Sequence, residues 1–251
     1  MNSDDIEPPP DIFRLYAVSS CPYCERVAIV ACKKDIVLQC ITNIVICFRL
    51  EVVNASNIPS IPSRFLWMDT EGLVPVLRHN GKVHFIIGYL FQKVESFHIP
   101  HSFSIHKLTM NGSRMIIEYL DDVKTEKSIL PDEPYLKAKQ EYDAFKLESV
   151  CDAIRKVTFT NRLIGDINLL AKQLAKAERM LQSPFYSGEE FGLPDIVLYP
   201  FIQRLFMIRS LINDYFLDVY FPLNYPKLMN WFVRMRTFPE VKLFISNYEA
   251  K

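Results

Sequence analysis

The residues best suited to chemistry form a Cys-Pro-Tyr-Cys motif at positions 21–24. A strand-forming run, Ile12–Val18, precedes the motif, and Pro22 begins a segment whose apolar residues recur at helical spacing. Cys21 is therefore expected at a helix start, where free backbone N–H groups and the helix dipole favour an anion. Because the thiolate is the reactive form of cysteine, we predict that Cys21 is a nucleophile with a lowered pKa.

Two residues on the same predicted helix support this chemistry. Cys24 lies three residues after Cys21, close enough to resolve a mixed disulfide, and Arg26 adds positive charge. A structural cysteine pair and half of a zinc site are the competing interpretations. A zinc site needs two more ligands at matched spacing, and no second Cys-x-x-Cys is formed by Cys32, Cys40 and Cys47. The sequence therefore favours thiol chemistry, and no metal site is predicted.

Composition excludes several other functions. The 251 residues contain 29 Lys plus Arg and 29 Asp plus Glu, so no net charge recruits nucleic acid or an anionic membrane. The start, MNSDDIEPPP, is acidic and proline-rich, unlike a secretory signal. The longest apolar stretch, Ile36–Phe48, is shorter than the roughly 18 residues that cross a bilayer. We expect a cytoplasmic protein whose six cysteines are kept reduced.

The pattern of elements changes near the middle of the chain. The first half predicts strands at Val74–Leu77 and Val83–Ile86 around an Asn-Gly turn, then a helix from Ser113, its expected N-cap, to Asp121. After a linker at Lys124–Pro134, the second half predicts helices only. Their expected ranges are 134–159, 166–182, 193–210 with Pro200 inside, 226–237 and 239–246.

Two stretches of the first half do not fit this pattern. Val37–Leu50 is an apolar run before a short strand expected at Glu51–Val53, and Ile87–Gly112 is long for a loop without regular structure. We interpret both as insertions outside the fold, with translated intron sequence as one explanation. The second stretch contains three histidines, at positions 98, 101 and 106, which we interpret as solvated rather than metal-binding because their spacing matches no ligand pattern.

Several spaced motifs together resemble an omega-class glutathione transferase. They are CPYCERV, EGLVPVL with NGKV, SRMIIEYLDDV, SGEEFGLPDIVLYPFIQRL and PKLMNWFVRM, within residues 11–36, 51–85 and 113–251. The resemblance implies an α/β thioredoxin-like domain at residues 11–123, followed by an all-α domain at residues 132–251. It also implies a cytosolic homodimer with thiol transferase and dehydroascorbate reductase activity, and glutathione as co-substrate without a metal.

The resemblance also implies roles for individual residues. Cys21 would form a mixed disulfide with glutathione, and Tyr23 would lie in the glutathione site. Val74, before a cis Pro75, would pair with the cysteinyl backbone of glutathione. Ser113 would hold the γ-glutamyl carboxylate, which suits a helix start.

The chain departs from the family at the glutathione site and beyond it. Gly112 stands where a Glu is expected, and Ile61 where a Lys is expected, so we predict weaker glutathione binding. Cys24 is an additional thiol, and CPYC is the glutaredoxin form of the motif. The segment from Gly192 to Asp195 resembles the family's helix capping box, with Gly192 where Ser or Thr usually stands, and we expect the role of Asp195 to be in folding.

Three alternative functions follow from these departures. A glutaredoxin-like dithiol oxidoreductase would use both cysteines of the motif. A chloride-intracellular-channel-like protein would share the architecture and insert in membranes, which the apolar run in the first domain favours. A folded but inactive variant is the third alternative.

Overall fold

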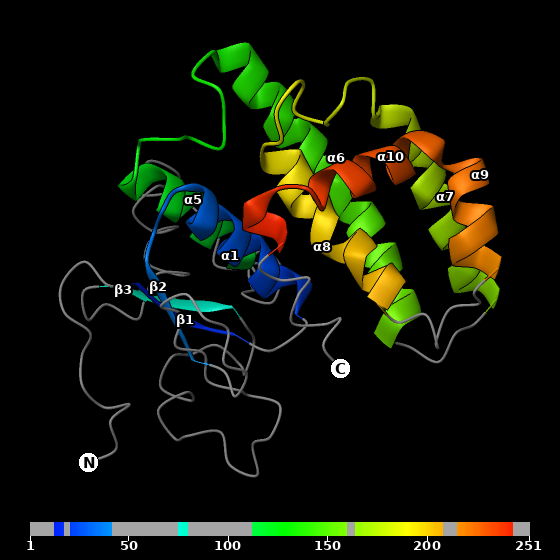
Figure 1. The fold of residues 1–251 in the computed structure, drawn as a ribbon, viewed down its shortest axis with the longest axis horizontal. Coiled ribbons are helices and arrows are strands. Elements are labelled where there is room, and N and C mark those ends of the chain that lie inside the picture. Colours follow the sequence, from blue (N-terminus) through cyan, green and yellow to red (C-terminus); the bar gives the residue numbers. More distant parts are fainter. Residues whose placement is uncertain are drawn as a thin grey trace, which may run out of the picture. The chain divides into compact units, whose positions relative to one another are not determined.

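The computed structural model describes residues 13–17, 21–41, 75–79, 112–159, 164–207 and 215–242. The chain divides into two compact units, Met1–Lys127 and Ser128–Lys251 (Figure 1). The described elements of the first unit are β1 (Phe13–Tyr16), α1 (Pro22–Lys33), β2 (Leu38–Ile41), β3 (Val76–His79) and α5 (Gly112–Val123). The first unit is therefore α/β, as the sequence predicts.

Strand β1 is the centre of a three-stranded sheet with the order β2-β1-β3. It runs parallel to β2 and antiparallel to β3, with Leu15 opposite both Cys40 and Leu77. Phe13, Leu15 and Ala17 are all buried, which is the period of two that a strand produces. Parallel neighbours need a crossover connection, and α1 supplies it between β1 and β2.

The described part of the first predicted insertion belongs to the sheet, so the prediction is wrong there. Leu38–Ile41 forms β2, and Leu38 is only 2% exposed. The run Leu-Gln-Cys-Ile carries two aliphatic side chains and pairs with β1 along its whole length. Residues 42–50 and the strand expected at Glu51–Val53 lie outside the described residues.

The boundaries of two other elements also differ from the prediction. Helix α5 begins at Gly112, one residue earlier than expected, so Gly112 is not part of an insertion and Ser113 is not the N-cap. Strand β3 continues to His79, where a turn was expected. Residues 80–111, with the Asn-Gly turn, the second strand and the rest of the second predicted insertion, lie outside the described residues.

The described elements of the second unit are helical. They are α6 (Pro134–Phe159), α7 (Ile164–Met180), α8 (Leu193–Met207), the π-helical turn η3 (Phe216–Tyr220), α9 (Phe221–Asn224) and α10 (Pro226–Met235). Twelve of the fifteen residues of α8 are buried, although Pro200 lies inside this helix. A helix that is apolar on all sides is expected at the centre of a bundle, and α8 packs against both α6 and α10.

Helix α10 illustrates how the helical core is built. Its buried side chains, Leu228, Trp231, Phe232 and Met235, follow the spacing of one helix face. The rings of Trp231 and Phe232 lie 6.2 and 5.7 Å from the ring of Tyr199 in α8. At its start, the backbone N–H groups of Lys227 and Leu228 donate to the Glu178 carboxylate of α7, at 3.0 and 2.8 Å.

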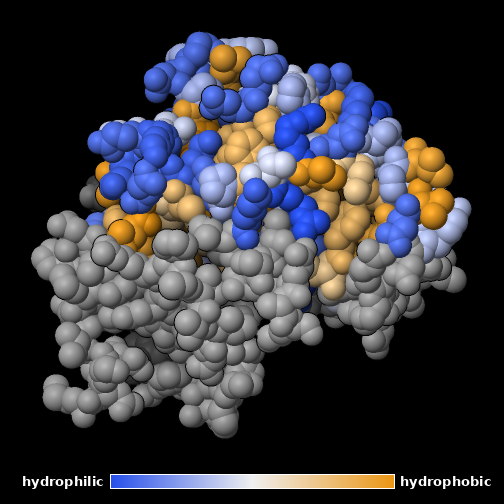
Figure 2. All heavy atoms as spheres, in the orientation of Figure 1, coloured by the Kyte–Doolittle hydropathy of each residue, from blue (hydrophilic) through white to orange (hydrophobic). Residues whose placement is uncertain are grey.

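The surface of the described residues is mixed. Figure 2 shows hydrophilic side chains over much of its coloured surface, with apolar side chains between them. On α6 three aromatic side chains at helical spacing are strongly exposed: Tyr135 at 72%, Tyr142 at 60% and Phe145 at 71%. Because these rings lie on one face of a helix, they form a candidate interaction surface.

Candidate active site

Cys21 occupies the position directly before α1. Its backbone is extended (φ −81°, ψ 114°), and its carbonyl accepts the first helical hydrogen bond from the Glu25 amide at 3.1 Å. Pro22 fits the first helical position because no N–H group is needed there. The helix therefore starts as the sequence predicts, with Cys21 next to the N–H groups of its first turn.

The two thiols of the motif differ in accessibility. Cys21 is partly exposed, whereas Cys24 is only 4% exposed. Both are free thiols, as are Cys32 and Cys151. Of the two motif cysteines, Cys21 is thus the one that an external sulfur atom reaches more easily.

The environment of Cys21 lowers its pKa to about 7. The largest cause is a hydrogen bond from the Cys24 thiol, and burial of Cys21 opposes it. The backbone N–H groups of Cys24 and Tyr23 also lower this pKa, and the positive charge of Arg26 contributes least. A thiol with this pKa is about half ionised at neutral pH.

Arg26 connects the turn that carries Cys21 to the start of α5. Its side chain is 0% exposed, and Nη1 donates to Oγ of Ser113 at 3.3 Å. The guanidinium carbon lies 5.2 Å from the ring centroid of Tyr23. Ser113 is also buried, at 1% exposed, so a ligand reaches its hydroxyl group only when the atoms that cover it move.

A second contact shows the relative direction of α1 and α5. Eight residues after Arg26 and Ser113, Lys34, which directly follows α1, donates to the Asp121 carboxylate of α5 at 2.6 Å. Lys34 Nζ also donates to two backbone carbonyls after α5, at 3.2 and 3.3 Å. The two helices are therefore parallel (Figure 1), and Cys21 and Ser113 lie at the same end of the pair.

The structure describes only some of the other predicted site residues. Pro75 is buried directly before β3, and Tyr23 is partly exposed. Val74, its peptide bond to Pro75, Ile61 and the three histidines at 98, 101 and 106 lie outside the described residues. Within the described ranges, no group of three or more His, Cys, Asp or Glu is arranged to hold a metal ion.

The contact between Arg26 and Ser113 was not predicted from the sequence, because 87 residues separate the two residues. A weak signal was present in α1 itself. Arg26 directly precedes a run of apolar side chains that the helix buries, Val27 to Ala31, and a charged residue at such a position needs a partner. The identity of that partner follows only from the packing of α1 against α5.

Comparison with known proteins identifies the family. The glutathione transferase omega-1 of Caenorhabditis elegans is 30% identical over 243 residues, which cover 92% of this chain and 80% of the relative. The chain belongs to the omega-class glutathione transferase family. Residues 158–234 also match the family model "Glutathione S-transferase, C-terminal domain".

Solved structures agree with this family at the level of the fold. Glutathione transferase Omega 3C from Trametes versicolor superposes with a TM-score of 0.67 at 18% identity, covering 94% of this chain and 90% of that chain. A glutathione transferase from Methylobacterium radiotolerans, solved in complex with glutathione sulfonate, gives 0.61 at 16% identity, covering 92% and 93%. This omega-class chain thus has the glutathione transferase fold, a thioredoxin-like domain followed by a helical domain.

Family membership supports an enzyme with glutathione-dependent transferase function. It also supports glutathione as the bound co-substrate. In the described part of this omega-class chain, no helix is both long and apolar enough to cross a membrane.

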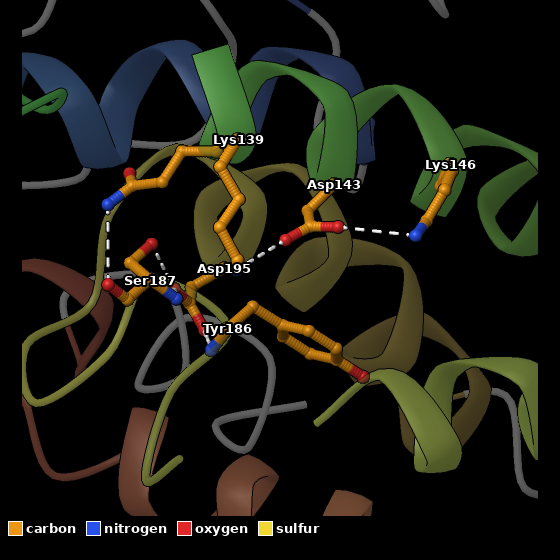
Figure 3. Close-up of polar contacts among 7 residues, drawn as sticks. Lys139, Asp143, Lys146, Tyr186, Ser187 and Asp195 are labelled. Atoms are coloured by element: carbon orange, nitrogen blue, oxygen red, sulfur yellow. Dashed lines mark hydrogen bonds and ion pairs between the residues drawn. The ribbon is translucent and has the colours of Figure 1, made fainter. Parts of the chain in front are cut away.

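The capping box belongs to the second, helical unit. Asp195, fully buried at the start of α8, accepts hydrogen bonds from the amide of Gly192 at 3.1 Å and from Nε1 of Trp231 at 2.7 Å. The amides of Tyr186 and Ser187 and the Ser187 hydroxyl also donate to it (Figure 3). All five bonds fix chain segments of the second unit, which supports a role in folding.

Proposed function

We propose that this protein is a glutathione-dependent thiol transferase and dehydroascorbate reductase in which Cys21 is the nucleophile. The observation that carries the proposal is the partly exposed Cys21 thiol at the start of α1, with a pKa of about 7. Such a thiol combines a large thiolate fraction with access for an external sulfur atom. The other described thiol of the motif, Cys24, is buried.

Thiol transfer then needs two exchange steps. The Cys21 thiolate attacks the glutathione sulfur of a mixed disulfide, GS–SR; the S–S bond breaks and RS⁻ leaves and takes up a proton. A second glutathione, as its thiolate, attacks the glutathione sulfur bound to Cys21. Glutathione disulfide leaves and the Cys21 thiolate is restored, so RSSG and GSH become RSH and GSSG.

Dehydroascorbate reduction has the same electron balance. Two glutathione molecules supply two electrons and two protons, and they leave as one glutathione disulfide. The Cys21 thiolate adds to a carbonyl carbon of dehydroascorbate, and a glutathione thiolate then attacks the Cys21 sulfur of this adduct. The C–S bond breaks, ascorbate leaves with the bonding electron pair and takes up a proton, and Cys21 is left in its mixed disulfide with glutathione. Its low pKa helps here too, because a good leaving thiolate is released easily when the second glutathione attacks.

The proposed glutathione site comprises Cys21, Tyr23, Val74, Pro75 and Ser113. The parallel packing of α1 and α5 supports it, because Cys21 and Ser113 lie at the same end of the pair. Binding is proposed to be weak, because Gly112 lacks a side chain and Ser113 is covered. No metal takes part in the proposed reaction.

A dithiol reaction like that of glutaredoxin is the second candidate. The hydrogen bond from the Cys24 thiol to Cys21 favours it, because a neighbouring thiol can attack the mixed disulfide. Glutathione would then leave with its sulfur reduced, and a Cys21–Cys24 disulfide would form.

The protein is also proposed to be a cytoplasmic homodimer. In the part of the chain that the structure describes, Cys21, Cys24, Cys32 and Cys151 form no disulfide, which suits a reducing compartment. The exposed rings of Tyr135, Tyr142 and Phe145 on α6 offer an apolar surface for a second copy. Sedimentation of Tyr142→Ser/Phe145→Ser should show a monomer if this surface holds the dimer, and an unchanged dimer would exclude it.

An activity assay with and without glutathione tests the proposed reaction. Reduction of a disulfide and of dehydroascorbate should require glutathione and should be abolished by Cys21→Ser. Cys24→Ser should retain activity if one thiol suffices and lose it if the dithiol reaction is used. An active Cys21→Ser protein together with an inactive Cys24→Ser protein would reverse the assignment of the nucleophile.

A further inference from the structure

Arg26 is a buried cation at the end of α1 and α5 where Cys21 and Ser113 lie. It is 0% exposed, and removing a guanidinium from water is costly unless hydrogen bonds and ring contacts fix it. The bond to Ser113 and the ring of Tyr23 provide such contacts. Arg26 therefore links the active-site turn to the first turn of α5 through a fixed side chain.

We propose that Arg26 is a positioning residue for glutathione, which orients the Ser113 hydroxyl group so that its proton is donated to the γ-glutamyl carboxylate. This inference rests on the proposed function, because it assumes that glutathione binds at this end of α1 and α5. Through Ser113, Arg26 makes the site prefer a ligand that has a carboxylate at its γ-glutamyl end.

In the hydrogen bond between Arg26 and Ser113, Arg26 is the donor. A serine hydroxyl has one proton to donate and two lone pairs that accept. Arg26 Nη1 donates to Ser113 Oγ, so it occupies a lone pair and leaves the hydroxyl proton for an anion. The donated bond also polarises the hydroxyl group and strengthens its own donation. The first-turn N–H groups of α5 favour an anion at the same position.

Arg26 is expected to affect the ionisation of the Cys21 thiol less than it affects recognition of the ligand carboxylate. The groups that lower the pKa of Cys21 are the Cys24 thiol, the amides of Cys24 and Tyr23, and last the charge of Arg26. On α5, the neighbouring Arg114 pairs with Glu118 at 3.8 Å. Replacing Arg26 should therefore change carboxylate recognition more than it changes thiol ionisation.

The test compares two ligands that cannot form a disulfide. One is S-methylglutathione, and the other is its analogue with the γ-glutamyl α-carboxylate converted to a carboxamide. Titration calorimetry should show that the unaltered protein prefers the carboxylate, and that Arg26→Met reduces this preference about tenfold. Arg26→Lys keeps the charge but not the planar donor group. Its preference for the carboxylate ligand should therefore lie between that of the unaltered protein and that of Arg26→Met.

Two control variants separate positioning from stability. Lys34→Met removes the other buried cation of the same helix pair, two turns away, and should leave the ligand preference unchanged although it destabilises the fold. Cys24→Ala should raise the pH midpoint of Cys21 alkylation more than Arg26→Met does, without changing the preference. A general loss of structure would instead reduce the ligand preference in Lys34→Met as well as in Arg26→Met.

The proposal is overturned if Arg26→Met keeps the full preference for the carboxylate, or if Lys34→Met loses it equally. If Arg26→Met does not fold, Arg26→Lys decides, because an unchanged preference in that variant also overturns the proposal. Failure of the proposed function is seen separately, as glutathione-dependent activity in Cys21→Ser.

Discussion

The two units of this protein each bury a charged side chain, and they hold it in different ways. Asp195 in the helical unit accepts five hydrogen bonds from the amides of Tyr186, Ser187 and Gly192, the Ser187 hydroxyl and the Trp231 indole. Arg26 in the α/β unit donates to Ser113 and contacts Tyr23, next to a thiol that changes its charge near neutral pH. The five donors to Asp195 come from segments of the helical unit, whereas the two described contacts of Arg26 are with residues of the proposed glutathione site.

The pKa values show the same difference. Burial raises the pKa of Asp195, and hydrogen bonds from Ser187, Gly192, Tyr186 and Trp231 oppose this effect. For Cys21, the hydrogen bond from Cys24 outweighs burial, so the pKa falls to about 7. The first environment resists ionisation of its carboxyl group, and the second promotes ionisation of its thiol.

The largest expected effect is the loss of Asp195. Asp195→Ala leaves several buried donors without their acceptor, and each such donor costs about 1–3 kcal/mol. We expect the free energy of unfolding in urea to fall by at least about 3 kcal/mol. Asp143→Ala is the control, because Asp143 only forms ion pairs near the surface, with Lys139 at 3.0 Å and Lys146 at 3.4 Å (Figure 3).

Surface ion pairs contribute below about 1 kcal/mol, so Asp143→Ala should change stability little. Equal losses in the two variants would contradict the view that the Asp195 network holds the helical unit together.

A smaller effect is expected at the capping glycine. A Cβ atom at Gly192 would lie 2.6 Å from Ser187 Oγ, 2.9 Å from Gln140 Oε1 and 3.0 Å from the Ile129 carbonyl oxygen. Gly192→Ala should therefore cost about 1–3 kcal/mol of unfolding free energy. A double-mutant cycle with Ser187→Ala should be less than additive, because the shortest contact is removed. Strict additivity would show that the Ser187 hydroxyl does not exclude a side chain at position 192.

In the α/β unit, a side chain restored at Gly112 should strengthen ligand binding. Gly112→Glu places a carboxylate at the first residue of α5, where the family resemblance leads us to expect Glu. We expect calorimetry to show about tenfold tighter glutathione binding, with a smaller gain for the uncharged Gly112→Gln. Tight binding by the unaltered protein, or no gain in Gly112→Glu, would refute the idea that this position limits affinity.

The smallest expected effect is a shift in the pH dependence of Cys21 alkylation. Because the pKa of Cys21 is lowered, the thiolate and hence the alkylation rate should rise as the pH increases through about 7. Cys24→Ala removes the main hydrogen-bond donor and should move the midpoint to higher pH. Cys24→Ser keeps a donor and should move it less. A midpoint near 8.5 in the unaltered protein would show that the thiol is unperturbed.

Local patterns in the sequence predicted much of this structure. Helix α6 spans Pro134–Phe159, the predicted range, because a proline marks its start and its apolar residues keep helical spacing. The start of α1 at Pro22, directly after Cys21, was also predicted from the sequence. The strand Leu38–Ile41 was missed because Val37–Leu50 was interpreted as an insertion before a strand expected at Glu51–Val53.

Contacts between distant segments could not be predicted. No local pattern pairs Arg26 with Ser113 or Lys34 with Asp121, since these pairs form only when α1 and α5 pack in parallel. The capping box at Gly192 and Asp195 was expected from the family resemblance, but Trp231, the donor from α10, lies 36 residues after Asp195. Long-range partners of buried charges are the part of the site that the structure adds.

Identifying the cysteine that forms the mixed disulfide with glutathione tests whether Cys21 is the nucleophile. The Cys24→Ser protein should be treated with glutathione disulfide and mapped by peptide mass spectrometry, because this variant cannot form an internal Cys21–Cys24 disulfide. We predict that the peptide containing Cys21 gains one glutathione, faster than the peptides containing Cys32 and Cys151. An unmodified Cys21, with glutathione on Cys32 or on no cysteine, would contradict the assignment of Cys21 as the nucleophile.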